Sequence, residues 1–143
     1  MAFSYEFYAV TSANKEVAEI KVLSFDVIGG AGGPVNVDSA DDVSIGTRFG
    51  QARKHKNIVL ITSATGGTVT VENAMRLTKY ASEKSTFNFH LVARQFNSQK
   101  MIFGMSLSDD KASVRKYPII DSGNYLRVEI ALPNGRIVNT STA

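Results

Sequence analysis

Apolar and polar residues alternate in several stretches of the chain, which is the pattern of β-strands with one buried face. The alternation is clearest at residues 3–9, 87–94, 101–107 and 125–132. Residues typical of tight turns follow these or neighbouring strands: Asn14-Lys15, Asn97-Ser98-Gln99 and Pro133-Asn134-Gly135. Because short connections join strands that run in opposite directions, the pattern predicts antiparallel hairpins.

Residues 16–28 form a longer predicted strand whose apolar positions change face. Up to Val22 the apolar residues stand at even positions, and from Leu23 to Val27 they stand at odd positions. Since successive side chains of a strand point to opposite faces, such a change requires an irregularity. We therefore expect a β-bulge, or a crossing between two packed surfaces, near residues 22–23.

Four glycines follow this strand within five residues. Their positions are Gly29, Gly30, Gly32 and Gly33. Glycine lacks a Cβ atom and adopts backbone conformations that other residues avoid. The segment lacks the Lys-Ser/Thr ending of a phosphate-binding loop, and the residues directly after it predict no helix that could receive an anion. We therefore predict a flexible loop over residues 29–47 that reaches toward a neighbouring molecule.

One segment has the period of an amphipathic helix. Between Glu72 and Lys84, Leu77 and Ala81 fall on one helical face with Tyr80 beside them. The apolar stripe is narrow, so a helix here cannot form a core alone. We expect it to cover the open end or the outer wall of a sheet.

Short strands in hairpins and one helix define the expected fold class. Residues 57–62 predict a further apolar strand, Gly66-Gly67 a turn, and residues 68–71 an extended continuation. Closing the sheet would remove exposed strand edges. We predict a mainly β fold, an antiparallel β-barrel, with one short α-helix and a long Gly-rich loop; a tight β-sandwich is the alternative. Residues 1–143 should form a single domain, since this length suffices for one core.

The composition narrows the chemistry. The 143 residues include no cysteine, which excludes disulfides, thiolate zinc sites and cysteine nucleophiles. The N-terminus lacks the basic region and the apolar core of a signal peptide, and no apolar run approaches the roughly 20 residues that span a bilayer. We expect a cytoplasmic protein without membrane insertion that is exported, if it is secreted, without a cleaved signal peptide.

Charge is concentrated in one region, although the formal net charge is only +3. A basic block consists of Arg48, Arg53, Lys54, His55 and Lys56. An acidic stretch just upstream consists of Asp38, Asp41 and Asp42. Proteins that bind nucleic acid usually add stacking aromatic residues, and only Phe49 is nearby. We therefore predict a contact with protein, or a solvated loop, in preference to nucleic acid, and we expect charge pairing across a subunit boundary.

Candidate catalytic and metal-binding groups are few. His55 lies in the basic block and His90 in the middle of a strand, and neither has a paired carboxylate close in sequence. Asp109-Asp110 follows a strand and predicts a turn before Lys111 in preference to a cation site. No nucleophile, base and orienting group can be assembled from these residues. We expect no enzyme activity, no cofactor and no metal.

A series of motifs runs in a characteristic order from about residue 16 to residue 132. A strand with the sequence IKVLSFDVIG (Ile20–Gly29) precedes Gly46, Arg48 and a basic entry to a strand at Lys54–Leu60. A helix and two strands follow at Ala74–Glu83, Phe87–Arg94 and Met101–Leu107. This order resembles that of Hcp, the tube protein of type VI secretion, whose fold is shared with phage tail-tube proteins.

The resemblance implies a hexameric ring whose subunits continue their sheets around a lumen. Such rings stack into a tube inside a contractile sheath, and the tube is expelled with a spike protein and carries effectors. We expect Asn88, His90 and Arg94 to face the lumen. The contact between subunits or rings is expected within residues 29–57, at Gly29, Gly30, Gly32, Gly33, Asp41, Asp42, Arg48, Arg53, Lys54 and Lys56.

Two alternatives remain at this point. A phage tail-tube protein would have much the same sequence pattern. From a different class, a monomeric oligonucleotide-binding barrel would use the basic block, and its DNA binding would weaken steeply with salt.

Overall fold

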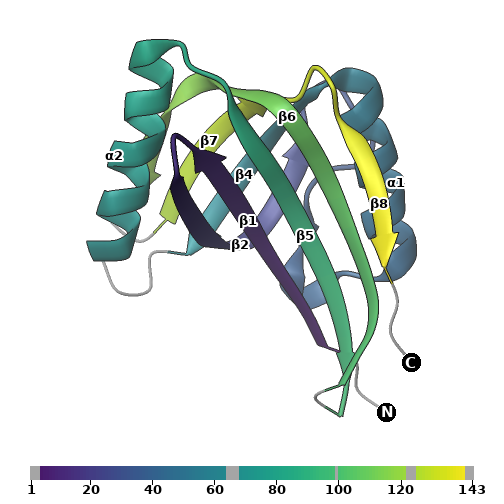
Figure 1. The fold of residues 1–143 in the computed structure, drawn as a ribbon. Coiled ribbons are helices and arrows are strands. Elements are labelled where there is room, and N and C mark those ends of the chain that lie inside the picture. Colours follow the sequence, from purple (N-terminus) through teal and green to yellow (C-terminus); the bar gives the residue numbers. More distant parts are fainter. Residues whose placement is uncertain (1–3, 64–67, 99, 122–124, 141–143) are drawn as a thin grey trace.

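Eight strands in the described part of the chain form one antiparallel sheet that closes on itself in this computed structural model (Figure 1). The structure describes residues 4–63, 68–98, 100–121 and 125–140. In chain order the elements are β1 (Ser4–Ala13), β2 (Glu16–Val27), β3 (Val35–Asn36), the 3-10 helix η1 (Val37–Ser39), α1 (Asp42–His55), β4 (Asn57–Ser63), α2 (Thr68–Glu83), β5 (Phe87–Asn97), β6 (Lys100–Asp121), β7 (Tyr125–Ala131) and β8 (Arg136–Thr140). The predicted mainly β, antiparallel barrel is confirmed.

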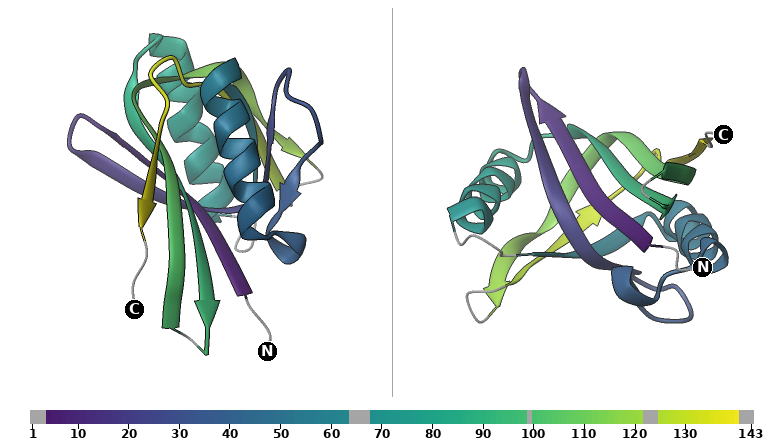
Figure 2. Two further views of the ribbon diagram at one scale, coloured as in Figure 1. Left: turned by 90° about the vertical axis from the view of Figure 1, so that its right-hand side faces the viewer. Right: turned by 90° about the horizontal axis from the view of Figure 1, so that it is seen from below.

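Six strands make up the ring, in the order β1-β5-β6-β7-β4-β2 and back to β1. Strand β3 adds to β2 outside the ring, and β8 adds to β6. The β5–β6 hairpin extends beyond the barrel at the lower end of Figure 1. Helices α1 and α2 lie on opposite sides of the barrel (Figures 1 and 2). Each side of the molecule therefore presents a different helix.

Strand β2 helps to close the ring because it changes neighbours along its length. Residues 16–22 pair with β1, and residues 22–27 pair with β4. The register with β4 shifts between Val22 and Ser24, which leaves Leu23 as the extra residue. The predicted irregularity is confirmed as a β-bulge, which bends the strand from one neighbour toward the other.

Strand β6 changes neighbours in the same way. Its register with β5 shifts between Asp109 and Ala112, and from Ser113 onward it pairs with β7. The buried Asp109 carboxylate accepts hydrogen bonds from the backbone N–H of Lys111 (2.6 Å) and of Asn134 (2.7 Å). The predicted turn at Asp109-Asp110 is therefore wrong: the carboxylate stabilises a bulge inside a long strand.

The core lies inside the barrel and is extended by one face of each helix. The rings of Phe7 and Phe25 are 5.6 Å apart, and the Phe25 ring is 5.3 Å from that of Phe49 on α1. On the other side, Tyr80 of α2 stacks on Phe87 at 4.8 Å. Both helices are thus held by aromatic contacts with the sheet, which are strong packing contacts.

The sequence predicted one helix, and the described residues contain two α-helices. The predicted helix at residues 72–84 corresponds to α2, which begins four residues earlier, so the extended structure expected for residues 68–71 is wrong. Helix α1 occupies residues 42–47 of the loop predicted at residues 29–47, and all but the last residue of the basic block. Neither described helix is long and apolar enough to cross a membrane.

Helix α1 forms because three apolar side chains recur at helical spacing and find the core. Ile45, Phe49 and Ala52 are completely buried. Asp41 caps the helix because its Oδ1 atom accepts a hydrogen bond from the Ser44 N–H (2.7 Å). In return, the Asp41 N–H donates a hydrogen bond to Ser44 Oγ. Such a capping box satisfies backbone donors at the start of the helix.

The remaining hairpins agree with the sequence prediction. Asn14 and Lys15 both have positive φ (51° and 69°) and connect β1 to β2, as a two-residue hairpin turn requires. Strand β7 buries the side chains expected from its alternation, and the predicted turn after Leu132 leads into β8. Asn97 pairs with Lys100 at the tip of the β5–β6 hairpin.

Candidate functional site

The Gly-rich segment is docked on α1 by a single arginine. The Arg48 Nε atom donates to the Gly33 carbonyl oxygen at 2.9 Å, and Nη1 donates to the carbonyl oxygen of Ala31 and to Gln51 Oε1 (2.9 Å). A guanidinium group offers several donors in a fixed plane, so it can hold two carbonyl groups of one loop at once. The segment therefore follows the surface of α1 and does not extend away from it.

Two glycines in this segment are required by its geometry. Gly32 and Gly33 have φ angles of +112° and +121°, which side-chain-bearing residues rarely adopt. A Cβ atom at Gly32 would also collide with the Arg48 guanidinium group. The glycines thus allow the backbone to wrap closely around Arg48.

The acidic stretch lies at the start of α1, where it forms a rigid surface. We call Asp41, Asp42 and Val43 the acidic end of α1. Asp42 Oδ1 accepts a hydrogen bond from the Tyr5 hydroxyl at 2.8 Å, and Gln95 Nε2 donates to the same hydroxyl at 2.7 Å. Helix α1 is therefore connected through one hydroxyl to β1 and to β5.

The position of Tyr5 also changes its acidity. Burial raises the pKa of the Tyr5 hydroxyl above its ordinary value of 10.0, and the hydrogen bond and negative charge of Asp42, with the charge of Asp41, raise the pKa further. The tyrosine therefore keeps its proton, and its donated bond, at physiological pH.

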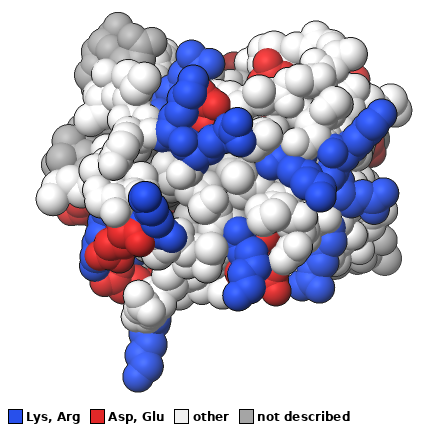
Figure 3. Space-filling view, turned by 90° about the horizontal axis from the view of Figure 1, so that it is seen from above, with Lys and Arg blue, Asp and Glu red and all other residues white. Residues whose placement is uncertain are grey.

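The basic residues gather at the opposite end of α1. Arg53 and Lys54 occupy the last turn, and Lys56 is the C-cap residue with φ 64°. Arg115 of β6 joins them, since its Nη1 atom donates to Asn57 Oδ1 at 3.4 Å. We call Arg53, Lys54, Lys56 and Arg115 the basic end of the barrel. Figure 3 looks toward this end and shows several separate groups of Lys and Arg side chains, with Asp and Glu side chains among them, on a face that is mostly uncharged.

The residues of the basic block predicted from the sequence thus lie in two separate places in the structure. Arg48 holds the Gly-rich segment, whereas Arg53, Lys54 and Lys56 lie at the far end of the helix. At 1.5 Å per residue, the two ends of this 14-residue helix are roughly 20 Å apart. The acidic stretch and the basic residues therefore do not pair within one molecule. The acidic residues interact favourably with the positive N-terminal end of the helix dipole, and the basic residues with its negative C-terminal end.

The three residues expected to line a lumen share the outer face of β5. Residues Asn88 and His90 are exposed, and Arg94 lies over the outward-facing Tyr8 ring with its Cζ atom 4.9 Å from the centroid. His90 Nδ1 is 2.6 Å from Ser108 Oγ on the neighbouring strand. This outer face of β5 is thus largely polar, with Val92 as its one apolar residue between positions 88 and 94.

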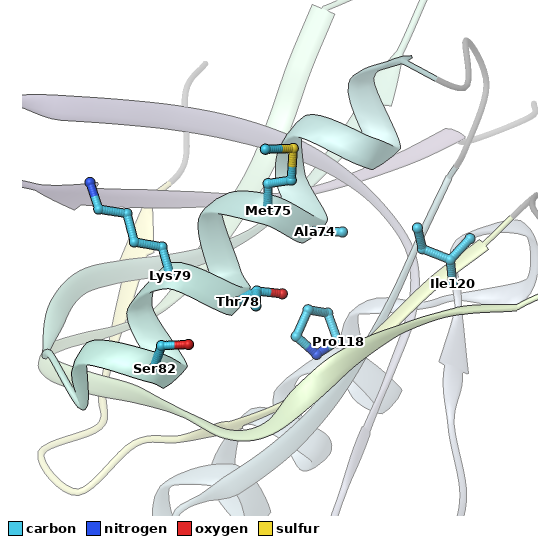
Figure 4. A pocket seen from close by; sticks show the side chains of 7 residues that line it. All are labelled: Ala74, Met75, Thr78, Lys79, Ser82, Pro118 and Ile120. Atoms are coloured by element: carbon cyan, nitrogen blue, oxygen red, sulfur yellow. The ribbon is translucent and has the colours of Figure 1, made fainter.

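An open groove between α2 and β6 was not predicted from the sequence. Its volume is about 570 Å³, and Figure 4 shows the side chains that line it: Ala74, Met75, Thr78, Lys79, Ser82, Pro118 and Ile120. Met75 and Ile120 are 67% and 44% exposed. Met75 lies on the outer side of α2, because the buried Leu77 and Tyr80 turn the other face of the helix inward.

The described residues contain no cluster of three or more His, Cys, Asp or Glu side chains that could hold a metal ion. Asp109, the best candidate for a cation ligand in the sequence, is occupied by two backbone N–H groups. His55 and His90 lie on different elements, α1 and β5. The surfaces that stand out are accordingly the acidic end of α1, the basic end of the barrel and the α2 groove.

Comparison with models of known protein families finds none that matches the chain. Comparison with curated proteins likewise finds no significant match.

Proposed function

We propose that this protein is the subunit of a homo-oligomeric ring that stacks into a tube, as the resemblance to Hcp implies. The observation that supports the proposal is that surfaces of different charge and polarity lie on different sides of the molecule. One molecule has an acidic and a basic surface at the two ends of α1, and an apolar groove on the side opposite α1. Unlike surfaces that point in different directions suit contacts that repeat from one copy to the next.

Further features support a structural role. The ring of hydrogen-bonded strands makes the barrel wall rigid, and the Gly-rich segment is docked on the middle of α1 through Arg48. The polar outer face of β5 suits the lining of a lumen. By the same resemblance we propose a hexameric ring, a surrounding contractile sheath, a spike protein and secreted effectors as partners, with export independent of a cleaved signal peptide. A phage tail tube would use the same subunit architecture.

The test is a measurement of native mass with electron microscopy of the same sample. A hexamer would have about six times the chain mass of 15.5 kDa, and its particles would be annular or tubular. A protein that remains monomeric over the micromolar range, with no annular particles, would contradict the proposal.

The basic end of the barrel favours one second candidate, a monomeric domain that binds oligonucleotides. Three residues near the end of α1 and Arg115 place four positive side chains together, which could neutralise phosphates. That candidate requires a monomer whose affinity for single-stranded DNA falls steeply with salt. The native mass and a salt titration of DNA binding therefore separate the two functions.

A further inference from the structure

Exposed apolar side chains gather on one side of the molecule. Five of the large ones in the described residues lie on α2 and on the end of the β6–β7 hairpin: Met75, Tyr117, Ile119, Ile120 and Tyr125. Their exposed fractions run from 44% to 67%. Ile120 lines the α2 groove together with Met75, whereas Tyr117 and Ile119 line a separate hollow with Arg127 and Glu129.

The α2 groove is one concave part of this surface. Met75 on α2 and Ile120 on β6 lie on its two sides; in the close-up view Ala74 lies between them and Pro118 lies next to Thr78 (Figure 4). Lys79 is the one charged residue among the described residues that line the groove, and its side chain extends from the edge of α2 away from Pro118 and Ile120 (Figure 4). The groove therefore suits an apolar side chain that is accompanied by negative charge.

The acidic end of α1 has this combination on the opposite side of the barrel. Val43 is 77% exposed, the highest fraction among the large apolar residues described. It directly follows Asp41 and Asp42, and the hydrogen bond from Tyr5 to Asp42 holds the helix start in place. A projecting apolar residue next to fixed carboxylates is complementary to the groove in shape and in charge.

We propose that the α2 groove binds the acidic end of α1 of a second copy of this chain. Val43 of one subunit lies between Met75 and Ile120 of the next, and a carboxylate of Asp41 or Asp42 faces the Lys79 ammonium group. The proposal rests on the proposed function in requiring self-association. Because the two surfaces lie on opposite sides of the barrel (Figures 1 and 2), the contact is heterologous and repeats head to tail around a ring.

Charge argues against the groove pairing with itself. In a two-fold symmetric contact the Lys79 side chains of both subunits would approach the same small apolar surface. Like charges brought together at the centre of an interface disfavour that arrangement. The head-to-tail contact instead places each Lys79 next to acidic residues.

The absence of cysteine from the sequence permits a direct test by disulfide crosslinking. In the full-length double variant Val43→Cys/Met75→Cys, the two thiols lie on opposite sides of one molecule. A disulfide requires Cβ atoms about 4 Å apart, so it can form only between neighbouring subunits. After oxidation with copper phenanthroline, we expect a ladder of covalent multimers on non-reducing gels that ends at the number of subunits in the ring.

Single variants and a matched pair serve as controls. Met75→Cys alone and Val43→Cys alone should give no ladder and at most trace dimers. Val138 on β8 is 41% exposed and belongs to neither proposed surface, so Val138→Cys/Met75→Cys presents an accessible thiol outside the proposed contact. A ladder of equal strength in this control, or efficient dimerisation of Met75→Cys alone, would overturn the head-to-tail contact.

Native mass distinguishes failure of this contact from failure of the proposed function. If the double variant forms native oligomers but no ladder, the assembly stands and the assigned surfaces are wrong. A different outcome is a double variant that is monomeric and forms no ladder while the unmodified protein is oligomeric. In that case the crosslinking is repeated with Val43→Cys/Ile120→Cys. Absence of covalent multimers from this second variant as well rejects the contact. If the unmodified protein is itself monomeric, both proposals fail.

Discussion

Tyr5 shows how one side chain fixes the position of a helix. Its hydroxyl accepts a hydrogen bond from Gln95 and donates one to Asp42, so β1, β5 and the start of α1 meet at a single oxygen atom. Deprotonation would remove the donor and place two negative charges side by side. The contact therefore depends on the protonated form, and burial together with the neighbouring carboxylates raises the pKa of Tyr5.

This arrangement predicts a loss of stability at alkaline pH. The pKa of Tyr5 is about 10 in the unfolded chain and higher in the folded protein, so above pH 10 the folded state binds more protons than the unfolded state. The contribution of Tyr5 is then complete below about pH 10 and decreases as the pH rises further. We expect Tyr5→Phe to lower the free energy of unfolding by about 1 kcal/mol near neutral pH, and by progressively less at alkaline pH.

Urea denaturation of both proteins at several pH values measures this difference. Tyr117→Phe, on the opposite side of the barrel, is the matched control and should follow the unmodified protein in the effect of pH on stability. A Tyr5→Phe deficit that stays constant from neutral pH to beyond pH 11 would show that the hydroxyl proton is not involved.

At the scale of elements, the Gly-rich segment and α1 act as one unit. Most of residues 29–34 are exposed, and the segment contributes no side chain to the buried core. Phe25 pairs with Val35, so deletion of Gly29–Pro34 would leave a three-residue connection in the β2–β3 hairpin. Two of these three residues, Asp26 and Val27, pair with β4, so we expect the two-residue β3 to detach from β2 while the six strands of the ring keep their pairings.

We therefore expect deletion of Gly29–Pro34 to leave a folded monomer that forms no long tubes. Circular dichroism and the urea transition report the fold, and electron microscopy reports the tubes. Ala31→Ser, a small change within the same segment, should leave both properties intact. Tubes of normal length from the deletion variant would exclude the segment from the contact between subunits or rings.

The elements were predictable to different degrees. Strands and hairpins followed from alternation and turn residues, and the bulge at Leu23 followed from the change of apolar face. Helix α1 was missed although Asp41, Ile45 and Phe49 carry the signal of a cap and one apolar face, because Gly46 and Gly50 lower the helix propensity of the segment. Packing of Phe49 against Phe25 offsets that weak propensity. This contact joins residues far apart in the sequence, so local sequence patterns do not predict it.

At the scale of the whole molecule, charge separates along α1. The basic end of the barrel points away from the acidic end of α1, and the α2 groove lies on a different side from both helix α1 and the outer face of β8. In a ring built through the acidic end and the groove, the basic end remains available for a contact between stacked rings. Contacts of this charged kind are sensitive to salt and to charge reversal.

Charge reversal at the basic end should separate stacking from ring formation. We expect Arg53→Glu/Lys54→Glu to shorten or abolish tubes while native mass still shows single rings. Lys15→Glu/Lys21→Glu makes the same change of net charge on the β1–β2 hairpin and is the control. Loss of the rings themselves, with the monomer still folded, would assign the basic end to the contact within a ring.

The sequence by itself determined most of the strands, the β1–β2 and β5–β6 hairpins, the part of helix α2 from residue 72 onward and the bulge in β2, since period-two and helical patterns record local geometry and turn residues record backbone angles. The tertiary structure alone decided which strands close the ring, that residues 42–55 are helical, and which side chains share a surface. Arg115 donates a hydrogen bond to Asn57, 58 positions away in the sequence, and Met75 and Ile120, 45 positions apart, line the same groove. Such contacts depend on long-range packing, in which no local pattern specifies the partner.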